Sequence, residues 1–203
     1  MRIAILVEGK TEMAFKRILL GFLQTRVAGR MPKLDFSPFD GRIPKATKLR
    51  RLVDNLLSDR RAPADAVIAL TDVYTGTREF SDAADAKRQM SEWVGSNPRF
   101  HPHAAQYEFE AWLLAYWTRI QELAGHNKSA PAGQPETVDH DHPPAERIAE
   151  IFRIGSRGRR YVKARDVLSI LQNQDLVLSA NACPELRAFL NTILRLSDAQ
   201  LLQ

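Results

Sequence analysis

The sequence has little cysteine and no long apolar run, and both shortages exclude whole classes of protein. Cys183 is the single cysteine among 203 residues, so neither an intramolecular disulfide nor a cysteine-based zinc site can form. No stretch approaches the ~20 consecutive apolar residues that a membrane-spanning helix needs. The apolar run at the start is interrupted by Glu8 and lacks the cleavage site of a signal peptide. These absences predict a cytoplasmic protein that has no membrane partner.

The composition is that of a globular protein, and its charge is unevenly distributed. Apolar residues make up 44% and charged residues 26%, which excludes global disorder. Residues 1–60 carry 13 Lys and Arg against 6 Asp and Glu, residues 61–120 carry 6 against 8, and the rest balance. A basic first third beside an acidic middle third favours nucleic acid as the partner.

Strand-like and helix-like segments alternate along the first two thirds of the chain. Short β-branched apolar runs predict strands at 2–7, 33–39, 65–71 and 101–107. Apolar residues at helical spacing predict helices from Thr11 to 23 and at 45–58, 81–94, 108–123, 145–152, 164–172 and 184–196. This alternation predicts an α/β fold with a mainly parallel sheet flanked by helices.

The chain is predicted to divide at a proline-rich stretch. Residues 125–144 hold four prolines, two glycines and three histidines, a composition typical of a surface loop or linker. We therefore expect an α/β domain over residues 1–124 and a small helical C-terminal extension over residues 145–203. The extension is expected to pack on the same domain.

Acidic residues follow three of the predicted strands. Glu8 follows the first strand, Asp72 the third, and Glu108 with Glu110 the fourth. The carboxyl ends of parallel strands meet in one crevice, so these carboxylates are expected to come close together. Gathered carboxylates need a cation, and oxygen ligands in an open arrangement suit Mg²⁺ or Mn²⁺. The alternative is that strands end in loops, and loops are often acidic.

A second group of candidates is basic. Residues 153–165 contain six basic residues and no acid, and Arg157, Arg159 and Arg160 are placed there to clamp phosphate. Lys10 lies beside a predicted helix N-terminus, where it can contact phosphate. The alternatives are a solvated basic loop and an exposed turn lysine.

Histidine and aromatic residues invite two further readings, and we favour the structural one in both cases. His101 with His103, and His140 with His142, lack a third ligand at helical spacing, so a zinc site is not expected. Trp112, Tyr116 and Trp117 follow helical spacing, which is more typical of a buried core than of a base-stacking platform.

Several motifs resemble those of a known family. The run V-E-G-K-T-E at 7–12 resembles the first motif of TOPRIM domains, the catalytic module of topoisomerases, bacterial primases and OLD-type nucleases. The fuller resemblance is to a family of small bacterial TOPRIM-like proteins classed as a domain of unknown function. Its motifs match D-V-Y-T-G at 72–76, Q-Y-E-F-E-A at 106–111, Y-V-K at 161–163 and C-P at 183–184. The resemblance runs from residue 1 to about residue 195.

The resemblance implies a TOPRIM or Rossmann-like fold with a Mg²⁺- or Mn²⁺-dependent site for phosphodiester chemistry. It makes Glu8 the metal-site glutamate or general acid/base and Asp72 a metal ligand. Glu108 and Glu110 become further ligands or orienting groups, and Lys163 becomes a catalytic cation. The remaining implied positions, which orient the ligands, are Glu12 and Tyr74.

One departure from the family pattern keeps other functions open. The superfamily has Asp-x-Asp after its third strand, whereas this chain has Asp72-Val73-Tyr74, so Glu108 or Glu110 replaces the missing ligand or one metal binds weakly. The large extra domains of topoisomerases are not expected in 203 residues. The leading hypothesis is a TOPRIM-type nuclease acting on DNA or RNA, as an effector of bacterial anti-phage defence beside a partner ATPase. The alternatives are a non-catalytic module that binds nucleic acid or the ATPase, and phosphotransfer on a small nucleotide.

Overall fold

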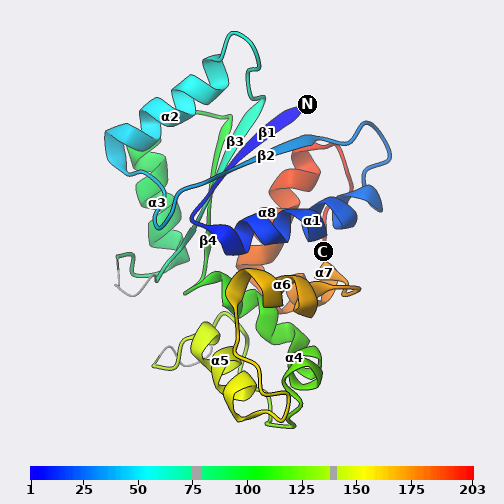
Figure 1. The fold of residues 1–203 in the computed structure, drawn as a ribbon. Helices are drawn as coiled ribbons and strands as arrows, with labels where there is room; N and C mark the ends of the chain where they lie inside the picture. The colour runs from blue at the N-terminus through cyan, green and yellow to red at the C-terminus, as the bar shows by residue number, and fades with distance from the viewer. Residues whose placement is uncertain (75–78, 138–140) are drawn as a thin grey trace.

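The computed structural model describes residues 1–74, 79–137 and 141–203, and its centre is a single parallel sheet (Figure 1). The four strands are hydrogen-bonded in the order β2-β1-β3-β4, and every neighbouring pair is parallel. The strands are β1 (Arg2–Val7), β2 (Lys33–Pro38), β3 (Ala66–Asp72) and β4 (Phe100–Ala105). The predicted α/β fold with a mainly parallel sheet is confirmed.

The strand order creates a switch point between β1 and β3. The chain passes from β1 outward to β2 and then returns to the other side of β1 to form β3. Ile5 of β1 accordingly pairs with Phe36 of β2 on one side and with Ile68 of β3 on the other. Connections that diverge in this way leave a crevice at the carboxyl ends of the two central strands.

Helices cover both faces of the sheet. Across the described residues they are α1 (Lys10–Gln24), α2 (Ala46–Ser58), α3 (Ala83–Val94), α4 (Trp117–Ala124), α5 (Pro144–Ile154), α6 (Lys163–Leu171), α7 (Leu176–Ala182) and α8 (Pro184–Leu196). A 3₁₀ helix, η1 (Phe109–Tyr116), precedes α4. Figure 1 shows α2 and α3 on one side of the sheet and α1 and α8 on the other. No helix in the described part of the chain has the length and apolar character to cross a membrane.

Two helix predictions need correction. The segment predicted as one helix over 108–123 is divided into η1 and α4, and α7 was not predicted. Seven of the eight residues of η1 are buried. Without an alternation of polar and apolar sides, the sequence pattern cannot distinguish a 3₁₀ helix from an α-helix there. The helix α1 begins at Lys10, one residue before the predicted start at Thr11. Gly9 is its N-cap, and the Glu12 carboxylate accepts the Gly9 N–H at 3.1 Å.

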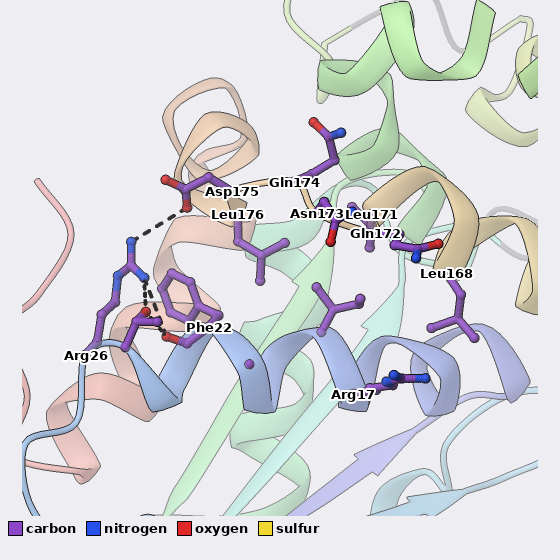
Figure 2. Close-up of a pocket in the computed structure, with 13 residues that line it drawn as sticks. Arg17, Phe22, Arg26, Leu168, Leu171, Gln172, Asn173, Gln174, Asp175 and Leu176 are labelled. Atoms are coloured by element: carbon purple, nitrogen blue, oxygen red, sulfur yellow. Dashed lines mark hydrogen bonds and ion pairs between the residues drawn. The ribbon is translucent and has the colours of Figure 1, made fainter. Parts of the chain in front are cut away.

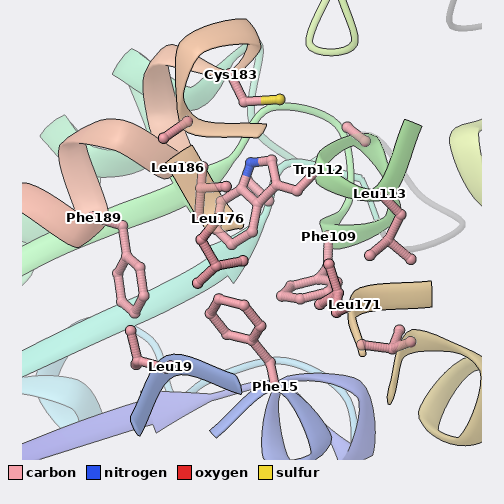
Figure 3. Packing of buried hydrophobic residues seen from close by; sticks show 14 of the residues in the cluster. Phe15, Leu19, Phe109, Trp112, Leu113, Leu171, Leu176, Cys183, Leu186 and Phe189 are labelled. Carbon is pink, nitrogen blue, oxygen red and sulfur yellow. The ribbon is translucent and has the colours of Figure 1, made fainter. Parts of the chain in front are cut away.

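The larger core lies on the α1 side of the sheet and is rich in aromatic rings (Figure 3). The rings of Phe15 and Phe109 meet edge to face at 5.3 Å, and Phe109 lies 5.1 Å from Trp112. Phe189 of α8 packs against Trp112 in the same core. Trp112, Tyr116 and Trp117 are buried, so the preference for a core over a base-stacking platform is confirmed.

His103 is buried between β4 and α8. Its Nε2 lies 3.0 Å from the Thr192 hydroxyl, and its ring meets the edge of Phe189. Burial lowers the pKa of His103 to about 3, so the ring is neutral throughout the physiological range. His101 lies two residues earlier on the same strand, and burial also lowers its pKa. His140 lies outside the described residues.

Candidate active site

Glu8 and Asp72 lie side by side at the switch point. Glu8 directly follows β1, and Asp72 is the last residue of β3. The Glu8 Oε1 accepts the Asp72 N–H at 3.3 Å and also a hydrogen bond from the Thr71 hydroxyl. The Glu8 carboxylate is therefore held by direct contact with the backbone of Asp72, 64 positions away, at the carboxyl ends of the central strands.

A strained turn after β4 brings the next acidic residues to the same place. Tyr107 has a φ of 75°, which is unusual for an aromatic residue and costs backbone energy. The Tyr74 ring stacks on the Tyr107 ring at 4.7 Å, and the Tyr74 N–H donates to the Tyr107 carbonyl oxygen at 2.7 Å. The chain then returns so that the Phe109 N–H donates to the Asp72 Oδ1 at 3.0 Å. Tyr74, predicted to orient the ligands, thus contacts the turn at Tyr107 through its ring and its backbone N–H. Gly76 of the same motif lies outside the described residues.

Five acidic residues form what we call the carboxylate cluster: Glu8, Glu12, Asp72, Glu108 and Glu110. Burial raises the pKa of Glu8 to about 7 and also raises the pKa of Glu12 and of Glu108. The pKa of Asp72 is raised well above its usual range, first by burial and then by the charges of the other four members. The predicted acidic residues therefore come together and repel one another.

Lys163 is the cation at one side of the carboxylate cluster. Its Nζ lies 3.1 Å from the Glu110 Oε1 and 3.5 Å from the Glu108 Oε2. Glu108 also accepts the Ala145 N–H at 2.6 Å, and the Tyr161 hydroxyl donates to the Glu110 Oε1 at 3.3 Å. The structure thus places Lys163 within contact distance of two of the predicted metal ligands.

Arg42 is the cation at the other side, and the sequence did not identify it. Its Nη1 lies 3.9 Å from the Glu8 Oε1 and donates to the Asp72 carbonyl oxygen at 3.0 Å. Its Nε lies 2.7 Å from the Glu79 Oε2, so a third acid holds the guanidinium in place. Arg42 stands in the loop after β2, and that position at the same edge of the sheet was the available signal.

The basic run over residues 153–165 is partly neutralised by the residue that follows it. Asp166 has a buried side chain that pairs with Arg159 and, at 2.9 Å, with Arg165. The Arg159 guanidinium is therefore neutralised by an ion pair with Asp166 within the protein. Arg157 is exposed and packs against Gly125, and Arg160 is exposed. Lys10, another predicted phosphate contact, is exposed at the start of α1.

The carboxylate cluster has the donor chemistry of a divalent-cation site. All its donors are carboxylate oxygens, which hard ions such as Mg²⁺ and Mn²⁺ prefer. Across the described ranges, however, no three His, Cys, Asp or Glu side chains are arranged to hold a metal ion. In this arrangement Lys163 and Arg42 contact the carboxylates instead. The residues fit a metal ion in chemistry, and the side chains must move to surround it.

A pocket of about 650 Å³ lies away from the carboxylate cluster, between α1 and the connection from α6 to α7 (Figure 2). Arg26 stacks over the Phe22 ring at 4.1 Å and lies 3.6 Å from Asp175. No member of the carboxylate cluster lines this pocket. The cavity and the acidic centre are therefore separate features of the molecule.

The fold and the carboxylate cluster define an α/β domain with an acidic centre at its switch point. Residues 7–194 match the family described as Domain of unknown function (DUF4276), and the chain belongs to this family. The structure is similar to the C-terminal region of the Burkholderia pseudomallei OLD protein, with a TM-score of 0.52 and 13% identity, covering 96% of this chain and 98% of that one. At that identity the likeness establishes a shared fold. No curated protein matches the sequence.

Replacing Lys163 tests whether it balances the carboxylate cluster. We expect Lys163→Met to lower the stability of the metal-free protein by about 1–2 kcal/mol, since two carboxylates lose their cation while Lys163 is half exposed and partly screened. Urea unfolding in chelator measures the loss, and Lys128→Met, which removes the surface Lys128–Glu150 pair, is the control. Equal effects of the two substitutions would contradict a role for Lys163 in charge balance.

Proposed function

We propose that the protein is a divalent-metal-dependent nuclease that hydrolyses phosphodiester bonds of DNA or RNA. The observation that carries the proposal is at the switch point: the Glu8 carboxylate accepts the Asp72 N–H, and the Asp72 carboxylate accepts the N–H of Phe109, which stands between Glu108 and Glu110. Ligands of parallel α/β domains bind at this place in the fold. The fold shared with the OLD C-terminal region and the TOPRIM-like motifs support the same chemistry.

Glu8 and Asp72, together with Glu110 or Glu108, would hold the metal ion. A bound Mg²⁺ or Mn²⁺ polarises a phosphoryl oxygen and lowers the pKa of a coordinated water. Glu108 or Glu110 would replace the second Asp of Asp-x-Asp, and the turn at Tyr107 supports this by bringing the neighbouring Phe109 N–H to Asp72. The charge repulsion within the carboxylate cluster favours binding of the cation.

The chain's own residues supply proton transfer and charge stabilisation. A Glu8 whose pKa lies about 7 is able to take up or release a proton near neutral pH. Arg42 holds that carboxylate in position from one side. Lys163, half exposed on the other side, is placed to neutralise the negative charge that develops on a transferring phosphoryl group.

The partners follow from charge and from the resemblance. The basic first third of the chain favours a polyanionic substrate over a neutral one. The TOPRIM-like motifs extend the proposal to an effector of bacterial anti-phage defence that works with a partner ATPase. No metal ligand in the proposal depends on that partner.

A cleavage assay tests the proposed activity. We expect the purified protein to cut DNA or RNA in Mn²⁺ or Mg²⁺ and to be inactive in chelator, and we expect Glu8→Gln to reduce cleavage by at least about 100-fold. Glu92→Gln, an exposed carboxylate on α3, is the matched control and should cut like the wild type. Cleavage that persists in chelator, or that survives Glu8→Gln, contradicts the proposal.

A second candidate is a non-catalytic module that binds nucleic acid. It is favoured by one observation: Lys163 and Arg42 already contact the acidic side chains that a metal would need. The same assay separates the two candidates. A module of this kind binds nucleic acid in chelator, retains binding after Glu8→Gln and cuts nothing in either metal.

A further inference from the structure

The outer surface of α2 carries an unusual concentration of exposed positive charge. Its inner side is buried through Leu49, Val53 and Leu57, which pack in the smaller core. The exposed basic residues on its outer side and just beyond its end are what we call the basic face of α2: Lys48, Arg50, Arg51, Arg60 and Arg61.

The basic face of α2 gathers, on one helix and the turn that follows it, several cations without an ion-pair partner among the described residues. Within the described ranges, no member of the basic face of α2 takes part in an ion pair, whereas Arg88, Arg119 and Arg159 all do. The acids within the same stretch are Asp54 and Asp59. Asp59 accepts the backbone N–H groups of Arg61 and Ala62 rather than binding a guanidinium. A set of unpaired cations on one helix leaves its field directed at solvent.

The basic face of α2 begins at the candidate active site. Lys45, the residue before α2, pairs with Glu79, and Glu79 also binds Arg42 beside Glu8. Since α2 connects the carboxyl end of β2 to the amino end of β3, it runs away from the active-site edge of the sheet (Figure 1). Its 13 residues extend about 20 Å.

We propose that the basic face of α2 binds the sugar–phosphate backbone of the nucleic acid and leads it to the carboxylate cluster, an inference that rests on the proposed nuclease function. The carboxylate cluster repels a polyanion, so cations are needed nearby to hold the nucleic acid. The basic run at 153–165 has fewer free cations than its sequence suggests, because Asp166 pairs with Arg159 and Arg165. Duplex nucleic acid carries one charge per about 1.7 Å, so a helix of this length faces several phosphates. The α2 sequence has no aromatic residue on which bases could stack, which favours backbone contacts without base recognition.

Binding to a labelled duplex, measured by fluorescence anisotropy in chelator, tests the surface apart from catalysis. The test variant combines Lys48→Ala, Arg50→Ala and Arg51→Ala. We expect its Kd to rise at least about tenfold and the slope of log Kd against log salt to fall by about 2 to 3, as for the loss of three phosphate contacts. The charge-matched control combines Arg119→Ala, Arg187→Ala and Arg195→Ala on α4 and α8. The control should bind within about twofold of the wild type at each salt concentration.

The outcomes separate the surface from the activity. If both triple variants weaken binding equally, the effect is one of net charge and the inference is overturned. If the α2 variant binds like the wild type while the wild type cuts in Mn²⁺, the proposed binding surface is wrong and the proposed nuclease activity is supported. If the α2 variant loses binding and the wild type cuts nothing, the binding surface is supported and the nuclease activity is contradicted. Circular dichroism of both variants checks that the substitutions leave the fold intact, since Arg119 and Arg187 of the control are only partly exposed.

Discussion

Asp72→Asn is expected to abolish metal-dependent cleavage and, at the same time, to stabilise the metal-free protein. Asp72 faces the charges of the four other members of the carboxylate cluster, which together with burial raise its pKa well above the usual range. An amide removes that repulsion and keeps an oxygen to accept the Phe109 N–H. It also removes a charged oxygen ligand from the site proposed to hold the metal. One substitution should therefore move activity and stability in opposite directions.

The expected sizes are large enough to measure. We expect cleavage to fall by at least about 100-fold, as for loss of a group that acts on the transition state. Relief of the repulsion should raise stability in chelator by about 1–2 kcal/mol, or about 2–8 °C in Tm for a chain of this length. Mn²⁺ should raise the Tm of the wild type and have little effect on the variant. Glu92→Gln, which changes an exposed carboxylate on α3, is the control. An Asp72→Asn protein that melts earlier and still cuts nucleic acid would rule out both the repulsion and the ligand role.

The carboxylate cluster lowers the stability of the fold, and the proposed chemistry explains why such residues stand there. Burying Glu8, Glu12 and Asp72 together costs free energy, because charged groups leave water and repel one another. The turn at Tyr107 adds backbone strain beside them. A sequence selected only for stability would place neutral residues here, so the concentration of cost at one edge of the sheet is itself a sign of function.

The position of Glu8 and Asp72 was predictable because it depends on short-range signals. Each follows an apolar run of strand length, and the carboxyl ends of parallel strands share one edge. The switch point follows from the strand order, which pairs β1 with both β2 and β3 and is not readable from periodicity. Glu108 and Glu110 were placed near Asp72 on the same argument. The means by which they reach it, a left-handed turn at Tyr107, has no signal in residue types.

The partners of the acidic residues were not predictable, since they depend on contacts between distant loops. Arg42 reaches Glu8 from the loop after β2, and its own anchor, Glu79, follows β3. The basic run was read as free charge because its thirteen residues contain no acid. Asp166 stands one position beyond that run and pairs with Arg159, which only the start of α6 makes possible.

The metal-free protein is expected to lose stability as the pH rises from about 4.5 to about 7. The pKa of the Glu8 carboxyl is 4.5 without the fold's influence and about 7 in the folded protein, chiefly because the group is buried and secondly because Glu12 lies near. The contacts with Thr71 and Arg42 act against the shift without cancelling it. The folded state therefore holds a proton that the unfolded state releases in this window. The contribution of Glu8 to the free energy of unfolding is therefore greatest below pH 4.5. It declines by up to about 3 kcal/mol as the pH rises through 7.

Urea unfolding in chelator at several pH values between 5 and 8, on the wild type and on Glu8→Gln, measures this dependence. His103 contributes with the opposite sign, since its pKa falls from 6.5 to about 3 on folding and its stabilisation is lost as the pH decreases. That contribution is common to both proteins and cancels in their difference. We expect the wild type to be the less stable of the two at pH 8 and to approach the variant at pH 5. Saturating Mn²⁺ should stabilise the wild type most at pH 8, where Glu8 is ionised and no proton competes for its oxygens. A difference between the two proteins that does not change with pH would show that Glu8 is charged in both states and that burial does not perturb it.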